Sequence, residues 1–270
     1  MITKIKKHIP VILLLSPGFI LLLTFVHIPV VKTIYMSFFS TPKGRKPSKF
    51  KGIENYEHMF SDPIFWKVMS NNIVYAISTI PSSIIIAIIM AQWVNSKLPG
   101  RPLLRFAYFL PVVLPLIAVG NIWLFFFLPG FGLIDQVGSL FGFQNTNILG
   151  NPDQVLWGII VVSIWKESGF YMIFFLAALQ GIPREMKEAA IIEGANSWQM
   201  FYKITLPMIT PTLLFVSVNA VITAFTRIEH LFTMTGGGPN YNSALLLYYI
   251  YENGFESVSY THLRAHETIP

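Results

Sequence analysis

The sequence predicts an all-α, polytopic membrane protein. Hydrophobic residues make up 53% of the 270 residues and charged residues only 12%, whereas roughly 25% of the residues in an ordinary soluble domain are charged. Charge-free runs recur along the chain, and each is close to the ~20 apolar residues that cross a bilayer as a helix. Together these observations favour a bundle of membrane-spanning helices surrounded by lipid.

Charge and cysteine content exclude several other classes of protein. The 19 lysines and arginines give a formal net charge of +6, but they fall in short clusters between apolar runs, so no nucleic-acid partner is expected. The chain has no cysteine, which excludes disulfides, thiolate metal sites and a thiol nucleophile. His262 and His266 have i,i+4 spacing but supply only two ligands, so no metal site is expected either.

Five spans are predicted, at about residues 9–35, 68–94, 106–128, 157–182 and 204–226. The first is interpreted as a retained helix, because its apolar part exceeds a typical signal core and no small-x-small cleavage site follows it. Residues 1–8 then form a cytoplasmic N-terminus, which places nine lysines and arginines inside and seven outside, as the positive-inside rule favours. Several prolines predict kinked helices that pack against neighbours: Pro81, Pro111, Pro115, Pro207 and Pro211.

A polar segment, "EAAIIEGANSWQMFYKITLPMITP", runs from Glu188 to Pro211 between strongly apolar stretches. We expect one helix to begin near Pro183, which suits a first helical turn, and to end at Gly194, which adopts positive φ without steric cost. Ser197 is the expected N-cap of a second helix, "SWQMFYKI". Two short helices at an angle would form a compact knob on the cytoplasmic side.

This segment resembles the EAA loop of permease subunits in bacterial ATP-binding-cassette (ABC) importers. Glu188-Ala189-Ala190 is followed by Gly194 six residues after the glutamate, and then by Ile204, Leu206 and Pro207. Further stretches between residues 9 and 256 resemble the sugar-importing branch of that family: "FKGIENYEHMF", "FWKVMSNNIVYA", "RFAYFLPVVLP", "IWKESGFYMIFFLAALQGIP" and "LFTMTGGGPN".

The resemblance implies a type I ABC importer permease in a bacterial cell (inner) membrane, without enzymatic activity or cofactor of its own. It implies four kinds of partner: a second homologous permease subunit, two ABC ATPase subunits, an extracytoplasmic sugar-binding protein and the lipid bilayer. The EAA loop, residues 183–207, would dock into the ATPase. The implied docking residues are Glu188, Ala189, Ala190, Gly194, Ala195, Phe201, Ile204, Leu206 and Pro207. The chain itself lacks the G-x-x-x-x-G-K-[ST] pattern that cradles nucleotide phosphates.

Polar residues inside the apolar runs are candidates for the substrate path. Asn219, Thr223 and Asn121 could exchange hydrogen bonds with sugar hydroxyls, although such groups also bond neighbouring helices. Charged residues near the spans are interpreted as boundary markers. Lys166 and Glu167 would mark the outer end of a span that starts at Ser168, and Arg227 and Glu229 would be interfacial anchors after the fifth run.

The C-terminal stretch departs from the family pattern. Residues 258–270, "VSYTHLRAHETIP", cannot form a helix of ~20 apolar residues and resemble adapter read-through, so we expect a non-native tail and five spans where the family has six. Two alternatives stay open for the function. One is an ABC permease for a non-sugar solute such as a polyamine, phosphate or glycerophosphodiester. The other is a secondary transporter driven by an ion gradient, which the charge-free centres of four spans disfavour.

Overall fold

The computed structural model describes residues 2–40, 48–96, 100–142 and 147–256. The predicted tail at 258–270, with His262 and His266, lies outside these residues. The chain forms two units, Met1–Pro63 and Ile64–Pro270, and each is described by itself. The described residues are helical, with an isolated bridge between Phe39 and Phe50 and no β-strand among them. The predicted all-α fold class is confirmed.

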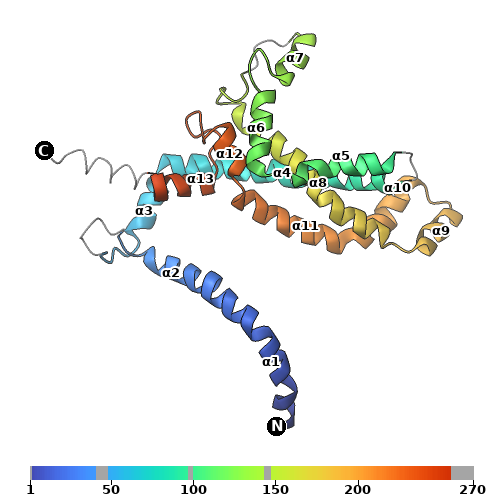
Figure 1. The fold of residues 1–270 in the computed structure, drawn as a ribbon, viewed down its shortest axis with the longest axis horizontal. Coiled ribbons are helices and arrows are strands. Elements are labelled where there is room, and N and C mark those ends of the chain that lie inside the picture. Colours follow the sequence, from blue (N-terminus) through green and yellow to red (C-terminus); the bar gives the residue numbers. More distant parts are fainter. Residues whose placement is uncertain (1, 41–47, 97–99, 143–146, 257–270) are drawn as a thin grey trace. The chain divides into compact units, whose positions relative to one another are not determined.

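The first unit consists of one long helical segment and one short helix (Figure 1). Helix α1 (Ile2–Leu22), the π-helical turn η1 (Leu23–His27) and α2 (Ile28–Met36) follow one another without a break. The stretch Val11–Met36 is long and apolar enough to cross a membrane. Helix α3 (Glu54–Ser61) completes the unit. The Asn55 side chain joins the two, because its Nδ2 donates to the carbonyl oxygens of Ser37 and Phe39 just after α2.

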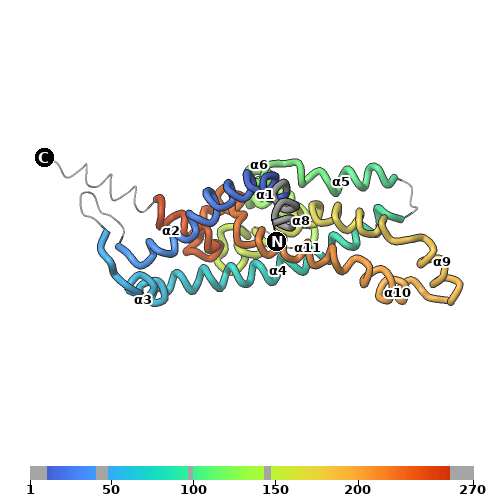
Figure 2. Tube along the Cα trace, turned by 90° about the horizontal axis from the view of Figure 1, so that it is seen from below, coloured from blue at the N-terminus to red at the C-terminus, as the bar shows by residue number. Residues whose placement is uncertain are grey.

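The second unit is built around helix α8 (Val155–Gln180). Helices α4 (Pro63–Asn95) and α11 (Leu206–Thr226) run alongside it (Figures 1 and 2). Buried apolar side chains from all three form one of two hydrophobic core clusters in the described residues, which includes Ile84, Ala87, Ile88 and Ala91 of α4; Tyr171, Met172, Phe175 and Leu176 of α8; and Ile209, Val216 and Ala220 of α11. Because α8 is enclosed on most of its circumference, its side chains decide how the other spans are placed.

The span predicted over residues 106–128 is not one helix. Helix α5 (Arg101–Val113) and helix α6 (Leu116–Phe126) are bent by 105° at the break between them. Leu114 is extended there, and Pro115 has no N–H to donate to the carbonyl of the preceding turn. The prolines predict kinks within a continuous span, and the structure has a break instead. The described residues therefore contain four candidate spans, or five if this bent pair is counted as one.

Short helices occupy the two ends of the second unit. Helix α9 (Arg184–Ile192) lies at the end where α4 meets α5 (Figures 1 and 2). Helix α10 (Ser197–Met200) continues through the π-helical turn η2 (Phe201–Thr205) into α11. The second helix of the predicted knob is thus the first part of the fifth span, which corrects the expectation of two separate short helices. The remaining short elements are α7 (Leu133–Leu140), α12 (Glu229–Met234), α13 (Leu246–Tyr251) and η3 (Glu252–Glu256).

Candidate functional site

The end of α9 in the EAA loop is fixed by backbone hydrogen bonds. Gly194 has φ +80°, as predicted from its position. Its amide donates to the carbonyl of Ile191 at 3.0 Å, and the amide of Ala195 donates to that of Ala190 at 2.9 Å. This pair of bonds is the Schellman arrangement, which satisfies carbonyls that a helix end leaves free. The turn is therefore specified by the loop's own backbone.

The start of α10 is fixed by a reciprocal pair of side-chain bonds. Asn196 Oδ1 accepts from the Gln199 amide at 2.8 Å, and Gln199 Oε1 accepts from the Asn196 amide at 2.9 Å. The N-cap is consequently Asn196, one residue before the predicted Ser197. Ser197 is already helical, whereas Asn196 has the extended backbone (ψ 168°) that an N-cap requires.

The predicted docking residues differ in exposure. Glu188, Ala189, Gly194 and Pro207 are exposed, whereas Ala190 is buried. The remaining predicted docking residues are partly buried: Ala195, Phe201, Ile204 and Leu206. Two large apolar side chains outside the predicted docking set are among the most exposed of the loop, with Ile192 at 86% and Trp198 at 68%.

A cavity of about 420 Å³ lies between the EAA loop and the end of α4. Its lining comes from both elements and from α8: Gln92, Asn95, Ser96, Leu179, Lys187, Ile191, Ala195, Ser197, Met200, Phe201 and Thr205. The loop is thus placed against the C-terminal end of α4 as well as being continuous with α11.

A polar seam, which we define as Tyr75, Thr79, Ser83, Ser163, Glu167, Tyr171 and Thr223, runs between α4, α8 and α11. These residues surround a cavity of about 10 Å³, which is about enough for one water molecule. The hydroxyl of Tyr75 donates to Ser163 Oγ at 2.8 Å, and Ser163 Oγ is 3.0 Å from His230 Nε2. Residues on α4 and on α8 recur at i, i+4 and i+8, so each helix turns a polar stripe toward the seam.

Lys166 reaches the break between α5 and α6. Its Nζ donates to the carbonyl oxygens of Pro111 and Leu114, both at 2.8 Å. The Pro111 carbonyl has no helical donor because Pro115 lacks the N–H, and the lysine supplies that donor instead. Lys166 is only 7% exposed, so the prediction that it marks the outer end of a span is wrong. It lies in the middle of α8 and stabilises the bent pair.

Glu167 ties α8 to the end of α11. Its Oε1 accepts from Arg227 Nη1 at 2.9 Å. Glu167 is 9% exposed, and its Oε2 is buried without a hydrogen-bond partner. Both it and Arg227 were predicted to be boundary residues, and the structure instead joins them across two helices. Glu229, also predicted as an anchor, is exposed.

Two of the three predicted substrate-path residues, Asn219 and Thr223, are neighbours one turn apart on α11, and the third lies on α6. Thr223 lies in the polar seam, where its Oγ1 donates to the Asn219 carbonyl at 2.9 Å. Asn219 Oδ1 is buried without a hydrogen-bond partner, and Asn121 is exposed on α6. The hydroxyls of the seam on α4 and α8 are not among the residues predicted from the sequence. Their i, i+4, i+8 recurrence within apolar runs is the signal that could have found them.

Comparison with known proteins shows the family of this chain. The model of the family "Binding-protein-dependent transport system inner membrane component" matches residues 83–247, more than half of the chain. The chain belongs to this family. The matched region contains the C-terminal part of α4, the bent pair, α8, the EAA loop and α11. The protein is therefore a multi-pass component of an ABC importer.

Named relatives align with most of the chain. It is 34% identical to the sulfoquinovosyl glycerol transport system permease protein SmoG of Agrobacterium fabrum, over 90% of this chain and 79% of that protein. It is 32% identical to the multiple sugar-binding transport system permease protein MsmF of Streptococcus mutans, over 91% and 84%. A solved ABC transporter involved in the import of the acidic polysaccharide alginate has the same fold, with a TM-score of 0.79, 24% identity and coverage of 96% and 88%.

Proposed function

We propose that this chain is the permease subunit of an ATP-driven carbohydrate importer, in which it forms half of the translocation pathway. Support comes from the family and from relatives named for sugar and glycoside transport. The pathway would be completed by a second homologous permease subunit. A carbohydrate-binding protein would deliver the solute from outside, and two ABC ATPase subunits would bind and hydrolyse the nucleotide, so this chain would have no catalytic role.

The EAA loop is the proposed contact with the ATPase. The observation that carries this assignment is the continuity of α10, η2 and α11, because it joins the loop to a membrane span without an intervening non-helical segment. The Schellman turn at Gly194 and the reciprocal cap at Asn196 hold the loop's shape. Displacement of the loop by closure of the ATPase would then be transmitted along α11. This arrangement requires the loop, and with it the N-terminus, to lie in the cytoplasm.

A pair of glycine variants tests the docking role. Gly194 and Gly130 both have φ +80°, and neither has an atom within 4 Å of the position that a Cβ would occupy. Gly194→Val and Gly130→Val therefore introduce the same backbone strain at different ends of the second unit. Co-purification of the ATPase with the membrane complex should fall for Gly194→Val and be retained for Gly130→Val. Equal ATPase recovery with the two variants would contradict the docking role.

A second candidate is an ABC permease for a non-sugar solute. The observation in its favour is a relative named as the sn-glycerol-3-phosphate transport system permease protein UgpA of Yersinia pestis, 30% identical over 82% of this chain. Uptake into proteoliposomes that contain the complete importer separates the candidates, with labelled oligosaccharides and labelled glycerol-3-phosphate as competing solutes. Transport that required an ion gradient and no ATP would instead indicate a secondary transporter.

A further inference from the structure

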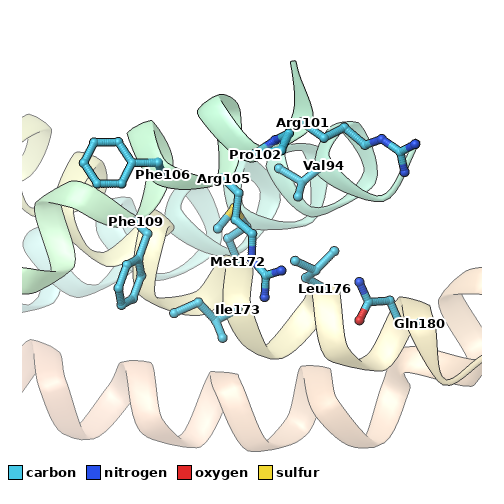
Figure 3. Close-up of a pocket in the computed structure, with 10 residues that line it drawn as sticks. All are labelled: Val94, Arg101, Pro102, Arg105, Phe106, Phe109, Met172, Ile173, Leu176 and Gln180. Atoms are coloured by element: carbon cyan, nitrogen blue, oxygen red, sulfur yellow. The ribbon is translucent and has the colours of Figure 1, made fainter. Parts of the chain in front are cut away.

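A third cavity, of about 770 Å³, lies between α5 and α8 near the end of α4 (Figure 3). Its volume is within the roughly 300–1,000 Å³ that ligand sites occupy. Ten residues line it: Val94, Arg101, Pro102, Arg105, Phe106, Phe109, Met172, Ile173, Leu176 and Gln180. None of the residues assigned to the EAA loop or to the polar seam belongs to this lining, so this groove is a separate feature.

The groove is polar at one end and apolar at the other. On α5 the lining positions Arg101, Arg105 and Phe109 recur every four residues and therefore lie on one helix face. The first and the last of them are about 12 Å apart along the helix axis. On α8, which runs in the opposite direction, Gln180 lies beside the arginine end and Ile173 lies deeper (Figure 3). Polarity therefore decreases from the mouth toward the interior.

The charge of the groove is positive. None of the ten lining residues is acidic, and Arg105 forms no ion pair with any residue that the structure describes. Figure 3 shows the Arg105 side chain reaching from α5 toward α8, between Ile173 and Leu176. An arginine held over an apolar floor attracts an anion that carries an apolar body, because the guanidinium pairs with phosphate oxygens while the floor excludes water.

The position of the groove agrees with a lipid occupant. Helix α4 ends at Asn95, α5 begins at Arg101 and α8 ends at Gln180, so three elements terminate at the level of the arginines. In a membrane protein this is the level of the headgroups, and the deeper residues Phe106 and Phe109 lie at acyl-chain depth. Both phenylalanines are exposed, at 61% and 38%, and are therefore available to acyl chains.

We propose that the groove between α5 and α8 is a binding site for an anionic phospholipid, with the phosphate at Arg101 and Arg105 and the acyl chains along Phe106, Phe109 and Ile173. Occupancy of the site would brace the N-terminal part of α5 against α8. The proposal does not depend on which solute the importer carries.

Native mass spectrometry of the purified importer tests the proposal, after reconstitution in nanodiscs of phosphatidylglycerol and phosphatidylcholine. Phosphatidylglycerol should be retained in preference to phosphatidylcholine. Arg105→Gln should lower that retention about fivefold, the ratio that corresponds to about 1 kcal/mol per basic residue near a lipid surface. Arg184→Gln is the matched control, because Arg184 is an exposed arginine of α9 outside the groove. Equal loss in both variants would mean unspecific surface attraction and would overturn the site.

A second variant tests whether lipid retention depends on the apolar part of the groove as well as on its positive charge. Ile173→Trp fills the apolar part and keeps both arginines, so it should also reduce phosphatidylglycerol retention, with the melting temperature of the complex as the check on folding. Retention unchanged by Ile173→Trp would show that acyl chains do not lie there. A photoreactive group at position 109 should crosslink to lipid, and crosslinking to the second permease subunit instead would assign the groove to a protein interface and overturn the proposal.

Discussion

The EAA loop and the polar seam are both polar regions of an apolar protein, but they are held together in opposite ways. In the loop every bond that defines the turn joins residues at most five positions apart, from Ala190 to Ala195 and from Asn196 to Gln199. The seam has local bonds as well, but it is distinguished by bonds between residues far apart in the sequence: Tyr75 with Ser163, and Glu167 with Arg227 beside the seam. The shape of the loop therefore depends on its own residues, whereas the bonds of the seam connect different spans.

This difference suits the loop and the seam to different roles in the permease. A loop that is stabilised locally can dock against a partner and be displaced as one body. A buried seam of hydroxyls and charges has few alternative arrangements, because each unsatisfied polar group costs several kcal/mol inside a membrane. Substitutions in the seam should therefore affect stability more than substitutions in the loop.

The largest effect is expected for Lys166→Met. The variant leaves the carbonyls of Pro111 and Leu114 without a donor, and a lost partner costs about 1–3 kcal/mol for each buried group. The melting temperature of the purified complex should fall markedly, and proteolysis should begin near the break between α5 and α6. Lys166→Arg, which keeps donors at the same place, should recover part of the loss. A fully stable Lys166→Met variant would show that the lysine does not hold the bent pair.

A smaller effect is expected at the ion pair between Glu167 and Arg227. The pair is buried on the glutamate side but 42% exposed on the arginine side, so solvent screens part of its energy. A double-mutant cycle with Glu167→Gln and Arg227→Gln should give a coupling energy of about 1–2 kcal/mol. Chemical denaturation of the complex measures it, and a coupling energy near zero would remove this pair from the interactions that fix α11.

Loss of the cap at Asn196 should have a still smaller, local effect. Asn196→Ala removes the acceptor for the Gln199 amide, which costs about 1 kcal/mol at a helix N-terminus. Hydrogen exchange at Gln199 and its neighbours should become about fivefold faster, the ratio equivalent to that energy, while exchange in α8 stays unchanged. Ser197→Ala is the control, since Ser197 is not the cap. Equal acceleration by both variants would contradict the assignment of the cap.

Asn219→Leu should leave stability nearly unchanged. The amide oxygen of Asn219 is buried without a partner, so replacing it with an apolar side chain is neutral or slightly stabilising. If Asn219 belongs to the substrate path, as predicted, uptake by the assembled importer should nevertheless fall. Uptake assays with a matched Val218→Leu control measure this, because Val218 is exposed on the same helix. Normal uptake by Asn219→Leu would assign the residue to packing.

The local features of this protein could be predicted from the sequence. Apolar run lengths indicated the all-α membrane class, and the position of Gly194 after the Glu188-Ala189-Ala190 run indicated the turn with positive φ. Even the misplaced cap was wrong by only one residue, since Asn196 and Ser197 are both good N-cap types. Each of these features depends on interactions within a few residues, where spacing and residue type carry the information.

The tertiary structure alone decided the roles of the charged residues in α8 and at the end of α11. Lys166 donates hydrogen bonds at a proline break more than fifty residues earlier in the chain. Glu167 accepts one from an arginine sixty residues later. The sequence spacing does not reveal such pairs, because they form only when α5 and α11 pack against α8. An isolated charge in an apolar run is equally compatible with a membrane boundary and a buried partner, and only packing distinguishes the two.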